Sequence, residues 1–168
     1  MRRARSLVFR GICFDMEGDN AACTFGKSLA HDLGAISVRL TPEQRIISHL
    51  AMTISSNYTV SLVRMAEKIM MSAGISNEIA QKMLSPLFLN TVHNISAYGA
   101  LNALTGPVSR GDVNVIKRHL DILASMEHEY QAVYRGLAQS ALEMALERGD
   151  VSVEKAEEIK KLLISDSG

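Results

Sequence analysis

The sequence has few of the residues that brace a small fold: it has no tryptophan, two cysteines and three prolines among its 168 residues. Cys13 and Cys23 lack a second pair of cysteines and have no histidines at zinc-site spacing, which argues against a disulfide framework or a zinc site. A chain with two free thiols fits a reducing compartment, so we expect a cytoplasmic protein. Aromatic residues are scarce while Met, Ala, Ile and Leu are plentiful, and this balance favours helices packed on helices.

Net charge and long apolar runs are also lacking. The 18 basic and 18 acidic residues cancel, which gives no reason to expect nucleic acid or an anionic membrane as a partner. The longest uncharged run, residues 46–63, is half polar and therefore unsuited to a lipid-facing span. The apolar run near the N-terminus is interrupted by Arg10 and no cleavage site follows, so no signal peptide is expected. A hydrophobic share of 47% is typical of a soluble globular protein.

The first forty residues predict a strand, a helix and a second strand. Residues 7–16 and 35–40 are rich in β-branched or aromatic residues, and Asp19 or Asn20 can cap the helix between them. Such a unit is too small to form a sheet that stands alone. The apolar side of this helix is expected to hold Ala22, Phe25, Leu29 and Leu33.

From Thr41 onwards the sequence predicts helices only. Thr41 to Gln44 forms a capping box with a proline at the first helical position, and the helix can run to Ala73. Its middle is apolar all round, so we expect it to be the central, buried helix. A second helix from Ser76 or Asn77 to about Gly99 is expected to kink at Pro86.

Three shorter helices are predicted after the linker at 104–111, one capped by Asp112, one over about 126–147, and one from Ser152. The expected inward residues are Val115, Ile116, His119, Leu120 and Leu123 in the first; Tyr130, Val133, Tyr134, Leu137, Ala141 and Met144 in the second; and Val153, Ala156, Ile159 and Leu163 in the third.

Common catalytic motifs are missing from the sequence. None of the eleven glycines forms a dinucleotide-binding or P-loop pattern, so the chain carries no cofactor fingerprint of its own. No nucleophile elbow is present. His119 with Asp121, and residues 127–129, lack the spacing of a helical zinc site, and solvated helix faces explain them better. No metal is expected.

Two polar stripes interrupt the apolar helices: His49, Thr53, Ser56 and Asn57 in the first, and Asn90, His93, Asn94 and Ala97 in the second. Buried polar groups must be paired or face a wet cleft, because leaving one unpaired costs about 1–3 kcal/mol. One interpretation is hydrogen bonding between the helices, and for His49 alone structural packing is the simpler explanation. The other is a substrate pocket in which the imidazole of His49 acts as acid or base.

The segment LTGPVSRGDV at 104–113 shares RGDV with residues 148–151. In the second copy Gly149 predicts a helix stop and Asp150 or Ser152 a new cap, and nothing there calls for a function. The first copy follows a Thr105-Gly106-Pro107 turn whose backbone can approach a ligand closely. Arg110, beside a helix start, is suited to holding a carboxylate or phosphate.

Three stretches together resemble a known family: FDMEGDN at 14–20, HLAMTISSNYTVSL at 49–62 and ALTGPVSRGDVNVIKRHL at 103–120. The chain is similar to the C-terminal part of Rossmann-like proteins carrying domain-of-unknown-function family 2520, relatives of pyrroline-5-carboxylate reductase, ketopantoate reductase and 6-phosphogluconate dehydrogenase. The resemblance implies a mainly α fold. Residues 1–40 would be a βαβ remnant of a Rossmann domain, and residues 41–168 a helical substrate and dimerisation domain like the C-terminal domain of 6-phosphogluconate dehydrogenase.

The resemblance also implies an NAD(P)-dependent oxidoreductase acting on a small C=O or C=N substrate, usually as a homodimer. In that hypothesis His49 donates a proton and Asn57 orients the substrate. The other candidate substrate-binding residues are Thr53, Ser56, Asn90, Asn94, Thr105, Gly106 and Arg110. Ser48 and the polar Thr53 and Ser55 depart from the family pattern, which predicts a more polar pocket.

Because the glycine-rich turn is missing, this chain alone is expected to bind neither NADP nor NAD well. A truncated or split gene, or a mis-called start, would produce such a chain. The alternatives are a non-catalytic helical dimerisation module and a regulator that binds a small ligand.

Overall fold

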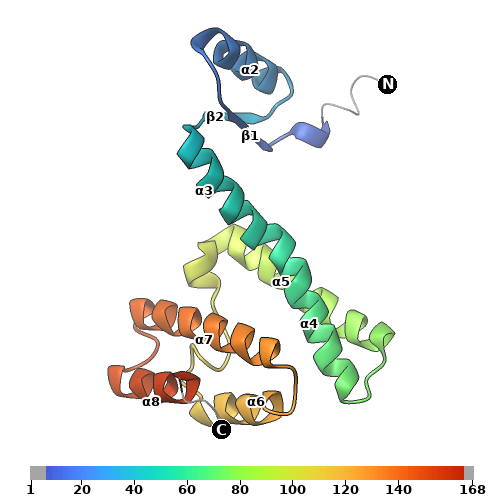
Figure 1. Cartoon of the computed structure of the whole chain (residues 1–168), viewed down its shortest axis with the longest axis vertical. Helices are drawn as coiled ribbons and strands as arrows, with labels where there is room; N and C mark the ends of the chain where they lie inside the picture. Colours follow the sequence, from blue (N-terminus) through green and yellow to red (C-terminus); the bar gives the residue numbers. More distant parts are fainter. Residues whose placement is uncertain (1–6, 165–168) are drawn as a thin grey trace. The chain divides into compact units, whose positions relative to one another are not determined.

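The computed structural model describes residues 7–164, and the chain divides into two compact units, residues 1–64 and 65–168 (Figure 1). Both strands lie in the first unit, and the short helices near the C-terminus pack in the second. The fold is therefore mainly α with a short parallel βαβ segment at its start, as predicted. The predicted domain boundary at residue 40 falls between β2 and α3 and stays a prediction.

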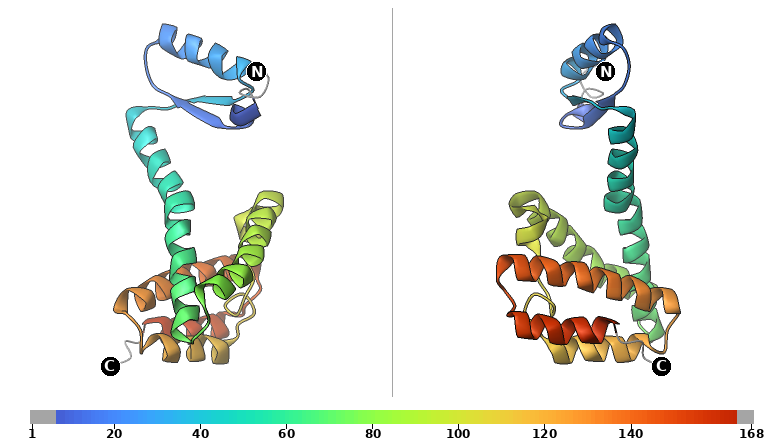
Figure 2. Two further views of the ribbon diagram at one scale, coloured as in Figure 1. Left: turned by 90° about the vertical axis from the view of Figure 1, so that its right-hand side faces the viewer. Right: turned by 60° about the vertical axis from the view of Figure 1, so that its left-hand side comes forward.

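The βαβ segment consists of β1 (Cys13–Met16), α2 (Asn20–Asp32) and β2 (Ile36–Arg39). The strands are parallel, with Cys13 opposite Ile36 and Met16 opposite Arg39, and α2 covers one face of the pair (Figure 2). The first strand is shorter than predicted. Leu7–Phe9 forms a 3-10 helix, η1, and Gly11 turns the chain with a φ of 79°, so pairing begins only after it.

Helix α2 is capped by the Asp19 carboxylate, which accepts from the Ala22 amide at 2.8 Å, as predicted. Its buried side is not the predicted one: Cys23 and Ala30 are buried, whereas Phe25 is 71% exposed and Leu29 is exposed too. The small residues decide this, because they let the helix approach the sheet. A β-carbon on Gly26 would lie 2.7 Å from Met16 Sδ.

The chain from 42 to 72 is helical throughout, but not as one α-helix. It comprises α3 (Pro42–Met52), a five-residue π-helix η2 (Thr53–Asn57) and α4 (Tyr58–Ser72). The predicted capping box is present. The carboxylate of Glu43 accepts hydrogen bonds from the backbone amide of Glu43 and from the Thr41 hydroxyl, and both lower the pKa of Glu43. The predicted burial is wrong for the described chain, because neither α3 nor η2 has a buried residue.

Helix α5 (Asn77–Ala103) starts at the predicted Ser76 cap. Pro86 lies inside it, and the break comes instead at Gly99, whose φ of 79° and ψ of 159° are not helical. The prediction of a kink at Pro86 is therefore wrong in position. Glycine is the residue that adopts a positive φ without a steric penalty, which explains why the distortion occurs there. Ala80 is the only buried residue of α5 in the described chain.

The core of the second unit lies among α6 (Val113–Leu123), α7 (His128–Arg148) and α8 (Val153–Ile164), which lie side by side in Figures 1 and 2. The predicted face of α6 is confirmed, with Ile116, Leu120 and Leu123 buried. On α7 the predicted Val133 and Leu137 are exposed. The residues buried on α7 and α8 are Ala138, Leu142, Ala145, Ala156, Ile159 and Leu163.

The predicted inward Val153 is exposed as well, because it is the first residue of α8 and lies before the packed turn. At the other end of this helix, the Arg135 guanidinium donates to the carbonyls of Leu162 and Leu163 at 2.9 and 2.8 Å. These carbonyls belong to the last turn of α8 and have no partner within the helix. A side chain of α7 thus closes the end of α8.

One polar pair joins α6 to α7. The His119 ring nitrogen Nδ1 lies 3.0 Å from the Tyr134 hydroxyl, and the two rings meet edge to face with centroids 5.8 Å apart. Both side chains are half-buried, and burial raises the pKa of Tyr134. His119 was predicted to face inward, and its tyrosine partner explains how a polar ring is accommodated there.

We predict that the pair makes folding sensitive to alkaline pH. The unfolded phenol ionises near pH 10, whereas the pKa of native Tyr134 is raised, so stability contributed by Tyr134 is present below about pH 10 and is lost above it. Urea unfolding at several pH values should show a steeper alkaline loss in the wild type than in Tyr134→Phe, which should itself lose about 1 kcal/mol at neutral pH. Tyr98→Phe, which changes an exposed tyrosine, should keep the wild-type slope; equal slopes in all three proteins would contradict the assignment.

Candidate functional site

The sequence-predicted site residues fall into two sets. His49, Thr53, Ser56 and Asn57 belong to the first unit, whereas the stripe on α5 and the loop at 104–111 belong to the second. Within the second unit, Thr105, Gly106 and Arg110 line one hollow. That the two helical stripes meet in a common pocket stays a prediction.

The stripe on the long helix coincides with the π-helix η2. The Thr53 amide donates to the carbonyl of His49, in α-helical fashion, but the next carbonyl along this row, that of Thr53, accepts from the amide of Tyr58, five residues on. A π-turn contains one residue more than an α-turn. Tyr58 is therefore the next residue on the same side of the helix as Thr53, and Ser56 is rotated away from that side. The simple α-helical spacing of the predicted stripe is therefore wrong after Thr53.

This stripe is also more exposed than predicted. Thr53 is half-buried, while His49, Ser56 and Asn57 are exposed, as are Asn90, His93, Asn94 and Ala97 on α5. Because η2 and α5 belong to different units, hydrogen bonding between the two helices stays a prediction. A short π-helix inside a long helix is rare and is frequently found at functional sites.

The hollow at the end of α5 is the best-defined feature that contains predicted residues. It has a volume of about 520 Å³, within the range of small-molecule sites. Its lining comes from the 104–110 loop and from the turn between α7 and α8: Leu104, Thr105, Gly106, Ser109, Arg110, Arg148 and Asp150. Both RGDV copies therefore contribute to one hollow.

Arg148 connects the two copies. Its Nη1 atom donates to the carbonyls of Leu101, Asn102 and Leu104 at 2.9, 3.4 and 2.9 Å, and its Nη2 atom lies 2.5 Å from Asp150 Oδ2. These carbonyls end α5 and would otherwise lack partners. The expectation that the second RGDV is only helix punctuation is therefore incomplete. Gly149 does end α7 in the left-handed conformation, but the flanking arginine holds the loop of the first copy.

The first copy forms a compact turn around its own backbone. The Ser109 hydroxyl donates to the Gly106 carbonyl at 3.1 Å, and Ser109 is buried together with Val108. Asp112 caps α6 as predicted, accepting from the Val115 amide at 3.1 Å. Arg110 is exposed, and its guanidinium has no hydrogen bond or ion pair with any residue in the described chain. A fixed turn thus presents a free cation.

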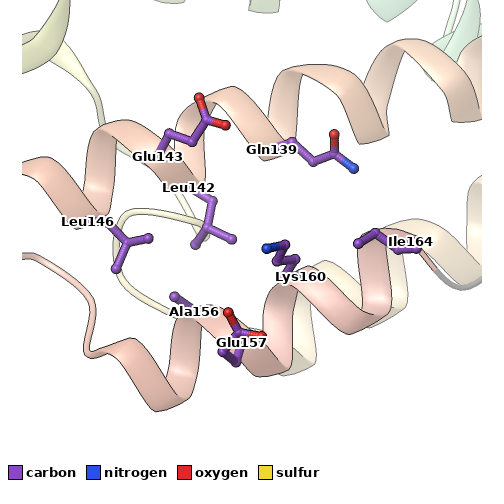
Figure 3. A pocket seen from close by; sticks show the side chains of 8 residues that line it. All are labelled: Gln139, Leu142, Glu143, Leu146, Ala156, Glu157, Lys160 and Ile164. Carbon is purple, nitrogen blue, oxygen red and sulfur yellow. The ribbon is translucent and has the colours of Figure 1, made fainter.

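Two other hollows contain no sequence-predicted site residue. One, of about 220 Å³, lies between α7 and α8; Figure 3 shows Leu142 directed toward α8, with Lys160 and Ile164 on the opposite helix. The other, of about 310 Å³, is beside the ends of β1 and β2. There the Arg39 guanidinium donates to Asn20 Oδ1 and to the Gly18 carbonyl at 2.8 Å each, and so holds the connection between β1 and α2.

Metal-ligating residues do not cluster in the described chain: no group of three His, Cys, Asp or Glu side chains in residues 7–164 is arranged to hold an ion. Cys13 and Cys23 are free thiols. Among the described helices, none is both long and apolar enough to cross a membrane.

The family and structure comparisons place this parallel βαβ segment and the helices that follow it among Rossmann-like proteins related to oxidoreductases. Comparison with known sequences gives the particular family. The chain belongs to the family described as "Domain of unknown function (DUF2520)", whose model matches residues 12–141. The resemblance noted from three sequence stretches is therefore confirmed. No curated protein matches the chain.

A comparison with solved structures supports this family assignment. The chain is similar to a protein described as a putative NADP oxidoreductase from Bacteroides fragilis, with 27% sequence identity and a TM-score of 0.66. The match covers 80% of this chain and 51% of that protein. The chain thus spans about half the length of the solved protein that it matches.

We predict that Arg148 is essential for the order of the 104–110 loop. Arg148→Met removes the partner of three carbonyls and of Asp150, and hydrogen bonds from a charged group contribute about 1.5–3 kcal/mol, so the free energy of unfolding should fall by about 2 kcal/mol. Amide hydrogen exchange should accelerate at 105–110. The control is Arg118→Met, on the exposed side of α6, which should change neither quantity; a similar effect in both variants would contradict this role.

Proposed function

We propose that the chain is the substrate-side part of an NAD(P)-dependent oxidoreductase that transfers hydride to or from a small C=O or C=N substrate. Membership of the family and the similarity to an NADP oxidoreductase structure support the general class. The observation that carries the proposal to the site is the π-helix Thr53–Asn57, because it places irregular helix where polar side chains interrupt an apolar sequence.

In this proposal His49 is the proton donor. Histidine is the side chain most often used as a general acid, and here it would donate a proton to the oxygen or nitrogen that hydride transfer leaves negatively charged. Asn57 orients the substrate through its amide, and Thr53 and Ser56 supply hydroxyl groups. Asn90 and Asn94 on α5 are further candidate substrate-binding residues in this proposal. His49 is exposed on α3, so a ligand can reach it.

The loop residues Thr105, Gly106 and Arg110 form the second part of the proposed site. Their hollow is bounded by a turn that Arg148 holds in place, which is the kind of preorganisation that substrate positioning needs. Gly106 has a φ of 107°, a conformation suited to glycine, so the turn cannot easily be built with another residue. The proposed role of this loop is to close the pocket on the substrate side.

NADP or NAD is the cofactor in this proposal, but the part that holds it is not provided by this chain. The sequence has no glycine-rich dinucleotide fingerprint, and the described βαβ segment has only two strands. We therefore propose that residues 1–168 alone bind NADPH weakly or not at all. The cofactor supplies hydride when it is bound, while this chain binds the substrate, orients it and provides the proton.

We predict that His49 is needed for turnover. The whole chain should be joined to the part of the Bacteroides fragilis protein that it does not match, and NADPH oxidation measured with a panel of small aldehydes, 2-oxo acids and cyclic imines. His49→Ala should lower kcat by about 10²- to 10⁴-fold, because general acid catalysis contributes that much. His31→Ala, an exposed histidine on α2, should leave kcat unchanged. Equal rates in the two variants would contradict the role of His49, and Asn57→Ala provides an independent check on orientation through KM.

The second candidate function is a helical dimerisation module, and helix α5 favours it. Large apolar residues are normally buried, yet in the described chain most of those on α5 are exposed. They are Ile79, Met83, Leu87, Phe88, Leu89, Val92, Ile95 and Tyr98. We propose that a second copy of the chain covers them; a homodimer is compatible with either candidate function.

We predict a homodimer that depends on α5. Leu87 and Leu89 are 65% and 66% exposed, so Leu87→Glu or Leu89→Glu should weaken association by at least tenfold in analytical ultracentrifugation, because each buries a charge in the interface. Leu137→Glu, at an exposed leucine of α7, serves as the control. A wild-type monomer at micromolar concentration would overturn the proposed dimer, and NADPH oxidation by the chimera separates the enzyme from the non-catalytic module.

A further inference from the structure

The charge of the hollow at the end of α5 is the starting point. Two arginines and one aspartate line it, Arg110, Arg148 and Asp150. Arg148 and Asp150 are 23% and 27% exposed and form an ion pair with each other, so they largely cancel. One positive charge is left, and it belongs to Arg110, which has no partner in the described chain. The hollow is therefore suited to a ligand with a negative charge.

The backbone around Arg110 offers neutral donors as well. Gly106 and Ser109 are among the residues that line the hollow, and the amide of neither donates a hydrogen bond to any residue of the described chain. Ser109 is only 8% exposed, and a buried amide without a partner is rare in folded proteins. Amides that point from consecutive turn residues into a concavity are a recurrent way to bind oxyanions.

The C-terminal carbonyls of α5 would repel a negatively charged ligand if they had no hydrogen-bond donors of their own. Carbonyls at a helix C-terminus carry partial negative charge, and those of Leu101, Asn102 and Leu104 lie next to the hollow. Arg148 donates to all three from a single nitrogen. These hydrogen bonds satisfy the carbonyls of the helix end, so the loop amides of the first RGDV copy are not needed as their partners. This is a positioning role, because Arg148 acts through the loop.

We propose that this hollow is an oxyanion site that binds a carboxylate or a phosphate group, with Arg110 as the charged partner and the Gly106 and Ser109 amides as neutral donors. It rests on the proposed function only in taking the anion to be part of the substrate. The substrate class is then a small carbonyl or imine compound that carries an acidic group. The volume of about 520 Å³ is sufficient for such a group and its connecting carbon atoms.

The test uses the full chain and two simple probes, inorganic phosphate and acetate. In two-dimensional NMR titrations, at least one probe should give saturable shifts of the Gly106 and Ser109 amides and of the Arg110 guanidinium. Arg110→Gln should weaken this binding by at least about tenfold, since hydrogen bonds to a charged group contribute about 1.5–3 kcal/mol. Arg118→Gln, at an exposed arginine of α6, should bind like the wild type.

The positioning role of Arg148 has its own readout. Arg148→Lys keeps the charge but loses the planar fork, so the Arg110, Gly111 and Asp112 amides, which are hydrogen-bonded within the turn, should exchange faster and the probe should bind more weakly. Glutamine at Arg110 should leave the exchange of these amides unchanged in the absence of a probe. Preference for phosphate indicates a phosphorylated substrate, and preference for acetate indicates a carboxylate.

Two results would overturn the proposal: shifts that grow linearly without saturation for both probes, or equal affinity in Arg110→Gln and Arg118→Gln. Failure here is distinguishable from failure of the proposed function. An active chimera that turns over only uncharged carbonyl compounds would overturn the oxyanion site while the oxidoreductase function stands. Saturable anion binding in a chain whose chimera transfers no hydride to any substrate would leave the site intact and overturn the function.

Discussion

The second unit depends on the contact between one guanidinium group and the end of a helix. Helix α5 ends with a non-helical residue, Gly99, and a final turn whose carbonyls have no intrahelical partner. Arg148 satisfies three of them and is itself oriented by Asp150, so the last turn of α5, the 104–110 loop and the start of α8 are fixed through one side chain. A lysine could provide the charge but not several donors in a fixed plane, which is why arginine suits this position.

The arrangement explains how a short loop can be both ordered and accessible. Leu104 and Val108 pack against the hydrophobic core of α6, α7 and α8, whereas Thr105 and Arg110 remain exposed. The loop is thus anchored on one side by apolar burial and on the other by Arg148. Binding residues are commonly found on loops that a rigid scaffold positions. Here the scaffold is the compact core formed by the three C-terminal helices.

Local signals in the sequence were sufficient to locate most helix ends. Thr41, Ser76, Asp112 and Gly149 all act as the caps or stops predicted for them, because capping depends on chemistry within three or four residues. The faces of α2 and α7 were harder to predict. Small residues such as Ala30 and Ala138 are buried in both helices, while larger apolar residues such as Phe25 and Leu137 are exposed. Hydrophobicity alone favours the larger ones, and only the close approach of neighbouring elements reverses that choice.

The residues of the candidate site were also only partly predictable from the sequence. The loop residues Thr105, Gly106 and Arg110 could be chosen from turn chemistry, and the structure places them around one hollow. The contribution of Arg148 could not be predicted in this way, because Arg148 joins positions more than forty residues apart in the sequence. Nor could the π-helix at Thr53–Asn57, since an inserted residue leaves no local signature and changes which residues share a side.

The distribution of buried residues separates stability from assembly. The core cluster is drawn from residues 108–163, a contiguous stretch of sequence, so it can form through contacts that are mostly local along the chain. Helix α5 adds no buried residue to this cluster in the described chain. Substitutions on its exposed apolar surface are therefore expected not to weaken the core, and in the proposed homodimer they would change the affinity of association without changing the stability of the fold. The exposed helix also has a disadvantage. A chain whose core has folded still presents a long apolar helix, and at high concentration such a surface favours aggregation until it is covered.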